Sequence, residues 1–106
     1  MNQTTINGLP LLVNIGTMRI IAEMTGKDVL NPLEGVTNVV DQCRHILYAG
    51  VRRSQGHNSQ FTMEDAAQHL DDMQPADLKK IVDFYVKAVS VKADESQQPS
   101  EEEKKS

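Results

Sequence analysis

The stretch TTINGLPLLVN (residues 4–14) carries the clearest local structural signal in this chain of 106 residues. At its centre, Asn7-Gly8 favours the two-residue type I′ turn of a β-hairpin, because both turn residues need a positive φ. Such a turn places Ile6 opposite Leu9, and successive side chains then alternate between the two faces of the hairpin. One face is mostly apolar, and we expect it to be buried. Its members are Thr4, Ile6, Leu9, Leu11 and Val13.

The two outer edges of this hairpin differ. Pro10 falls at a position of the second strand whose nitrogen points away from the first strand, so the hairpin keeps its own hydrogen bonds. The proline removes a donor from the outer edge of the second strand and so discourages pairing with a further strand. The first strand has no such residue, and we expect its outer edge to be open to self-association or to a protein partner.

A first helix is predicted over residues 15–25, with Gly26 as its C-terminal stop. Its main apolar stripe consists of Met18, Ile21, Ala22 and Thr25. Ile20 and Met24 lie off that stripe. A short helix with apolar residues on two sides is usually packed between other elements, so we expect Ile20 and Met24 to face the hairpin.

The longest helical pattern spans residues 36–54, and its wide apolar face predicts the central helix of the core. The members of that face are Val36, Val39, Val40, Cys43, Ile46, Leu47, Gly50 and Val51. A third helix is expected to begin after Thr62, which with Asp65 forms a near-capping box. Pro75 suits the first turn of a fourth helix, which is expected to run to about residue 91.

The predicted fold is therefore α+β and mostly α: a two-stranded N-terminal hairpin packed on a bundle of about four helices. Residues 1–92 are expected to form one domain, which is large enough to fold without disulfides. Residues 93–106 read ADESQQPSEEEKKS, a polar and acidic composition that predicts a disordered tail. The single cysteine, Cys43, excludes an internal disulfide and fits a reducing cytoplasm.

The charge distribution argues against nucleic acid as a partner. The net charge is −4. Residues 93–106 hold five acids against two lysines, a net of −3, which leaves −1 for residues 1–92. A nucleic-acid binder normally shows a basic face. The only basic pair before the last helix, Arg52-Arg53, is interpreted as a solvated helix end favoured by the helix dipole. No apolar run approaches the ~20 residues of a membrane span, so no membrane partner is expected.

No catalytic, cofactor or metal site is predicted. Cys43 and His45 are two positions apart, which places their side chains about 200° apart on a straight helix, on the basis of ~100° per residue. His57 and His69 fall on other elements, and the glycines are dispersed rather than gathered in a phosphate-binding loop. Adjacent acids such as Asp71-Asp72 do not converge on a helix. We therefore expect a protein that is not an enzyme.

Protein binding remains as the expected chemistry. Four apolar or aromatic residues fall off the main helical stripes and are the candidate binding residues. They are Ile20, Tyr48, Phe84 and Val86. Aromatic and aliphatic groups that gather on one exposed patch are typical of a protein interface.

Three stretches, in this order, resemble the tail assembly chaperones of long-tailed bacteriophages and prophages. They are INGLPLLVNIGTMRIIAEMTG (residues 6–26), ILYAGVRR (residues 46–53) and the Thr-Met-Glu-Asp start of the third helix. The resemblance covers roughly residues 4–90. The segment LPLLVN departs from it, because charged or aromatic residues are expected there.

The resemblance implies a non-enzymatic protein of the host cytoplasm that takes part in virion assembly and is absent from the finished particle. It would bind the long, helical, apolar tape-measure protein and keep it soluble until the tail tube forms. The tail-tube protein and further copies of the chain are the other partners implied, and the family contributes no catalytic residues. The alternative that the sequence leaves open is a small helical regulatory or adaptor protein of phage or bacterial origin.

Overall fold

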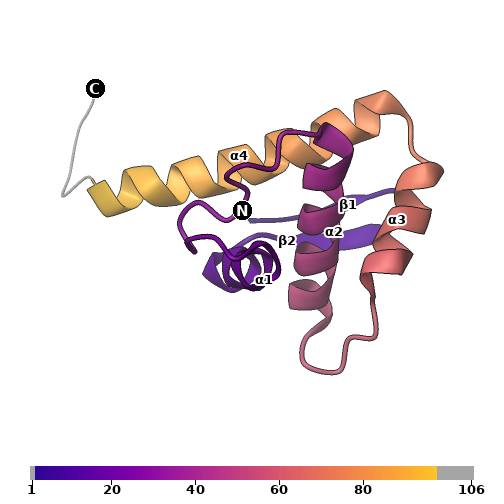
Figure 1. Cartoon of the computed structure of the whole chain (residues 1–106), viewed down its shortest axis with the longest axis horizontal. Coiled ribbons are helices and arrows are strands. Elements are labelled where there is room, and N and C mark those ends of the chain that lie inside the picture. The colour runs from indigo at the N-terminus through magenta and orange to yellow at the C-terminus, as the bar shows by residue number, and fades with distance from the viewer. Residues whose placement is uncertain (1, 98–106) are drawn as a thin grey trace.

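The computed structural model describes residues 2–97, with side chains described for residues 2–90. The chain forms a two-stranded antiparallel hairpin followed by four helices (Figure 1). The strands are β1 (Gln3–Ile6) and β2 (Leu9–Leu12), and the helices are α1 (Ile15–Thr25), α2 (Val39–Gln55), α3 (Met63–Asp71) and α4 (Pro75–Gln97). The predicted fold class is confirmed.

The hairpin has the register that the Asn7-Gly8 turn predicts. Ile6 pairs with Leu9 and Thr5 with Pro10. Asn7 and Gly8 have φ values of 50° and 81°, as the type I′ turn requires. Ile6, Leu11 and Val13 on the apolar face are buried, whereas Gln3 and Thr5 on the other face are exposed.

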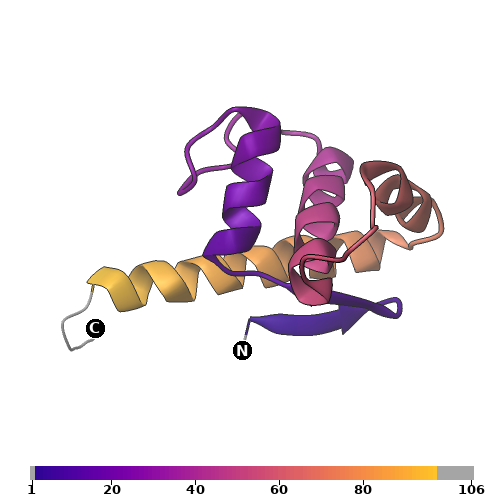
Figure 2. The ribbon, with the colours of Figure 1, turned by 90° about the horizontal axis from the view of Figure 1, so that it is seen from below.

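Helix α2 is the centre of the fold, as its wide apolar face predicts. It packs against β2, α1, α3 and α4, and α4 also contacts β1. Figure 2 shows the hairpin lying along one side of the helices, and Figure 1 shows α2 running across its strands. The buried core draws on every element, including Leu11, Ile21, Ile46, Leu70 and Ile81.

The helix on which the hairpin packs differs from the one that we expected. We expected Ile20 and Met24 of α1 to cover its apolar face, and this was wrong. The hairpin packs mainly on α2 through β2, and Met24 is exposed. The physical reason is Gly50, where α2 has no side chain and the strand approaches closely: a Cβ at Gly50 would lie 3.3 Å from the carbonyl oxygen of Leu12.

Helix α2 begins three residues later than predicted. Asn38 is its N-cap, and the Asn38 side-chain oxygen accepts hydrogen bonds from the backbone N–H groups of Val40 (2.9 Å) and Asp41 (3.2 Å). Val36 therefore precedes the helix, and its carbonyl accepts a hydrogen bond from Gln42 Nε2. Val39 and Val40, which we expected in the core, are 47% and 45% exposed.

The ends of α1 and α3 agree with the sequence signals. Gly26 follows α1 in the left-handed conformation, with φ 74°. Thr62 and Asp65 form the reciprocal capping box at the start of α3, with N–H to oxygen distances of 3.0 Å in both directions. These short-range motifs determine where the chain turns between its elements.

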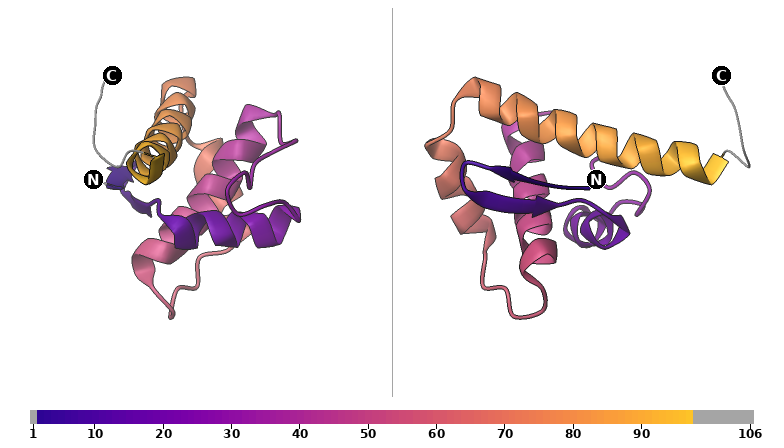
Figure 3. Two further views of the ribbon diagram at one scale, coloured as in Figure 1. Left: turned by 90° about the vertical axis from the view of Figure 1, so that its left-hand side faces the viewer. Right: turned by 180° about the vertical axis from the view of Figure 1, so that it is seen from behind.

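Helix α4 is longer than predicted and continues to Gln97 instead of ending near residue 91. The expected domain boundary at residue 92 therefore falls inside this helix. The part of the expected acidic tail that follows residue 97 lies outside the described residues. Figure 3 shows α4 running past the β1 side of the hairpin and projecting beyond the other elements.

Candidate protein-binding surface

The four candidate binding residues lie in two different environments. Ile20, Tyr48 and Phe84 are partly buried and pack against the core. Val86 is 51% exposed on the outer side of α4. Only Val86 therefore has the exposure expected of a binding residue, and the other three contribute to the packing of the fold.

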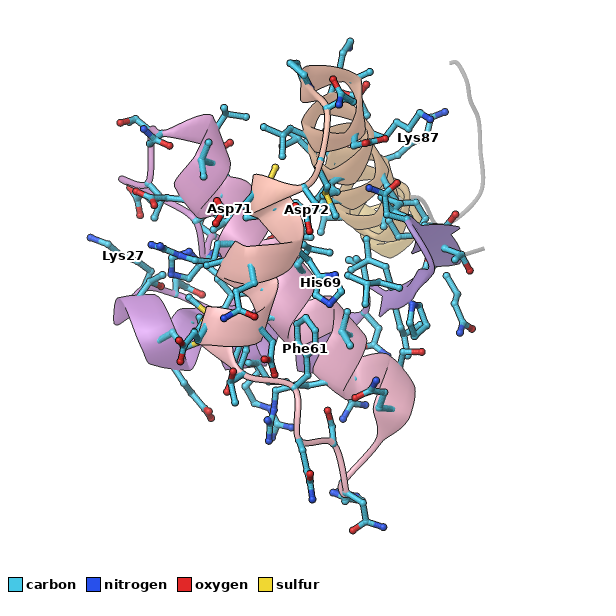
Figure 4. The ribbon with its side chains drawn as sticks, turned by 90° about the vertical axis from the view of Figure 1, so that its right-hand side faces the viewer. Lys27, Phe61, His69, Asp71, Asp72 and Lys87 are labelled. Carbon is cyan, nitrogen blue, oxygen red and sulfur yellow. The ribbon has the colours of Figure 1, made fainter. Side chains whose placement is uncertain are left out.

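Tyr48 takes part in a chain of contacts that holds the loop between α2 and α3. The guanidinium carbon of Arg52 lies 5.3 Å from the centre of the Tyr48 ring, a cation–π geometry. Arg52 Nη1 donates a hydrogen bond of 2.8 Å to the carbonyl oxygen of Phe61. The Phe61 ring in turn stacks on His69, with 5.8 Å between ring centres, and Figure 4 shows the two side by side.

The arginine pair lies in the last turn of α2, as expected of basic residues at a helix end, but it is less solvated than expected. Arg52 and Arg53 are both partly buried. The Arg53 guanidinium lies against Gly16 of α1, and a side chain at Gly16 would make it move aside. These two cations join α2 to the following loop and to α1, which helix periodicity alone does not reveal.

The structure adds exposed apolar residues that the sequence reasoning missed. The exposed apolar set, as we call it, consists of Ile15, Met24, Leu30, Val39, Val40 and Val86. Leu30, in the loop before α2, is the most exposed at 73%. Recognition of Asn38 as an N-cap would have placed Val39 and Val40 in the first turn of α2. Nothing in the sequence indicated that Leu30 would be exposed instead of packed against the core.

Cys43 and His45, which the sequence places two positions apart on α2, both contact backbone carbonyl groups of the fold. Cys43 is fully buried, its Sγ lies 3.4 Å from the carbonyl oxygen of Leu78, and burial raises the pKa of the thiol to about 11. A thiol with that pKa stays protonated near neutral pH, so it is a poor nucleophile and metal ligand there. His45 Nδ1 lies 2.7 Å from the carbonyl oxygen of Asp41.

Acidic residues are frequent on α3, but they do not gather around a common point. Asp71 and Asp72 follow one another at the end of the helix, and Figure 4 shows both there, beyond His69. Among the side chains of residues 2–90, no group of three or more His, Cys, Asp or Glu residues is placed to hold a metal ion. In the described part of the chain, no helix has the length and apolar character that a membrane span needs.

Comparison of the chain with protein-family models, with curated proteins and with solved structures finds no match. The surface described above and the segments quoted from the sequence are therefore the basis for a functional proposal.

Proposed function

We propose that this chain is a phage tail assembly chaperone that acts in the host cytoplasm. It would bind the apolar helical tape-measure protein and keep it soluble during tail assembly. The observation that carries the proposal is the exposed apolar set, because a chaperone for an apolar helix needs aliphatic side chains outside its own core. The order of the three resembling segments supports the same proposal.

The small number of exposed side chains in this set suits a client that must later be released. Complete burial of a valine or leucine contributes roughly 1.5–3 kcal/mol, so covering a half-exposed one contributes about 1 kcal/mol. Each such contact then strengthens binding by about fivefold. Binding also costs translational and side-chain entropy, so a few such contacts favour a reversible complex over a permanent one.

Co-expression with a tape-measure protein tests the proposal. We expect the wild-type chain to raise the soluble yield of that protein and to co-purify with it. The proposal fails if the solubility of the tape-measure protein is unchanged and the two proteins do not co-purify. The position of the gene is a second observation, and a site between a tail-tube gene and a very long tape-measure gene is expected.

Two matched pairs of variants test the surface itself. Val40→Asp and Val86→Asp each place a charge within the exposed apolar set and should reduce co-purification of the tape-measure protein by about fivefold. Thr37→Asp and Ser90→Asp add the same charge at exposed polar positions nearby and should leave co-purification unchanged. Equal losses in both kinds of variant would show that added charge, and not the apolar surface, is responsible.

A further inference from the structure

The tip of the hairpin is joined to the start of α4 through a single carboxylate oxygen. Asn7 and Gly8 at the tip are exposed. Asn7 Nδ2 lies 3.4 Å from Asp77 Oδ2. The same oxygen accepts a hydrogen bond of 3.1 Å from the backbone N–H of Gln74 at the start of α4. Asn7 therefore contacts the same carboxylate that caps the first turn of α4.

We propose that Asn7 is a site of spontaneous deamidation. The backbone nitrogen of Gly8 attacks Asn7 Cγ, a C–N bond forms, the bond between Cγ and Nδ2 breaks, and ammonia leaves with the proton lost by Gly8. Water then opens the resulting succinimide at either of its two carbonyl groups. The products are aspartate and isoaspartate at position 7.

The residue that follows each asparagine selects this site. Gly8 has no side chain to hinder the attack, and no heavy atom lies within 4 Å of the position that its Cβ would occupy. The other asparagines precede larger residues, or in one case a proline, whose nitrogen has no proton to lose. They are Asn2, Asn14, Asn31, Asn38 and Asn58. The attack requires the turn to leave its native backbone conformation, and the long Asn7–Asp77 hydrogen bond is a weak restraint on that movement.

Both products weaken the contact between the hairpin and α4. Aspartate replaces a hydrogen-bond donor with a negative charge beside Asp77, and like charges this close repel. Isoaspartate also adds one carbon to the main chain of a two-residue turn. That turn sets the pairing of Ile6 with Leu9, so the register at the tip is lost. Deamidation therefore releases the tip of the hairpin from α4.

Incubation of the full chain in mildly alkaline buffer at physiological temperature tests the modification. Peptide mass spectrometry with fragment ions locates the mass gain that accompanies exchange of NH₂ for OH, and a methyltransferase assay detects isoaspartate. We expect Asn7 to convert first, ahead of the exposed Asn58. The proposal is overturned if Asn58 is deamidated before Asn7. It is also overturned if Asn7 of the folded chain stays unmodified over the time in which Asn7 of the urea-unfolded chain is deamidated. The variant Asn7→Gly, which fits the turn and has no amide, is the control.

The variant Asn7→Asp tests the consequence, because it mimics one product. We expect a lower urea midpoint than in the wild type, and we expect Asp77→Asn to reverse most of that loss. If Asn7→Asp lowers the midpoint equally in the wild-type background and in the Asp77→Asn background, repulsion between the two carboxylates is excluded as the cause. A double-mutant cycle isolates this pairwise effect.

Discussion

At the scale of single residues, Gly50 is the glycine where an added Cβ would have the nearest neighbour. A Cβ at this position would meet Leu11 Cδ1, would lie 3.1 Å from Leu11 Cγ and would lie 3.3 Å from the backbone oxygen of Leu12. The side chain of Leu11 can shift, but the backbone of β2 is held by its pairing with β1. Glycine at this position is therefore required for packing, although glycine weakens a helix interior.

Gly50→Ala should destabilise the protein. Alanine favours the helix by about 0.8–1.0 kcal/mol, but overpacking of a core costs about 1–3 kcal/mol. We therefore expect a net loss of up to about 2 kcal/mol, measured by urea unfolding. The smaller side chain in Leu11→Val makes room, so Gly50→Ala should cost less in that background. An equal cost in both backgrounds would show that Leu11 is not the obstacle.

Burial of Cys43 and Tyr85 makes the stability fall at alkaline pH. Burial raises the pKa of Cys43 from 9.0 to about 11 and that of Tyr85 from 10.0 to about 12. Both groups lose their protons at lower pH in the unfolded chain than in the folded one, so the folded state binds more protons in this range. The slope of the unfolding free energy with pH is then negative. This stabilisation is complete below pH 9 and is lost as the pH rises through 11 and 12.

Cys43→Ala isolates the contribution of the thiol. Below pH 9 the variant is expected to be less stable than the wild type because of the lost side-chain volume. The difference in urea midpoint between wild type and variant should shrink between pH 9 and pH 11, the range in which the Cys43 thiol titrates. A difference that stays constant across this range would contradict the raised pKa.

At the scale of elements, local capping competes with periodicity. The apolar spacing of Val36, Val39 and Val40 predicts a helix from residue 36, but Asn38 interrupts that pattern and caps α2. A side chain that accepts two backbone N–H bonds at a helix start stabilises that boundary more strongly than a weak propensity does. The loop before α2 is consequently long, and Leu30 lies exposed within it.

Asn38→Ala should destabilise α2 by about 0.5–2 kcal/mol, because two backbone donors lose their acceptor. Urea unfolding followed by circular dichroism measures this change. Asn58→Ala, at an exposed position in the loop that follows α2, is the matched control and should stay within about 0.5 kcal/mol of the wild type. If the two variants are equally stable, the cap at Asn38 makes no net contribution.

Some features of the fold could be predicted from the sequence, and others could not. The Asn7-Gly8 turn, the Gly26 stop and the Thr62–Asp65 capping box depend on neighbouring residues, so they could be predicted. The packing of the hairpin on α2, instead of on Ile20 and Met24, depends on contacts between distant parts of the chain. For the same reason, the sequence separates exposed Val86 from partly buried Phe84 only when the orientation of α4 is known.

At the scale of the whole molecule, the arrangement around α2 predicts cooperative unfolding. One helix contacts β2, α1, α3 and α4, so the loss of any of these contacts exposes part of the same core. Cys43 reports on this core because its Sγ lies against α4 at Leu78. The hairpin and the α2–α4 contact should therefore open together.

Ile6→Ala in β1 tests this coupling from the hairpin. Removal of the buried side chain should lower the free energy of unfolding by about 2–5 kcal/mol. Labelling of Cys43 by a thiol reagent should then accelerate by the same factor by which the population of the unfolded state rises. Thr5→Ala on the exposed face of the same strand should leave both stability and labelling unchanged. If Ile6→Ala lowers the stability while the labelling rate of Cys43 stays the same, the hairpin opens independently of α2 and α4.

The position of α4 changes how the edges of the hairpin should be understood. We expected the outer edge of β1 to be open, but α4 contacts β1 and runs along that side. Pro10 removes a donor from the outer edge of β2. Stacked fibrils grow when an unpaired strand edge templates the next chain. With one edge beside a helix and the other interrupted by proline, this small sheet is a poor seed for amyloid, although it contains the apolar segment LPLLV.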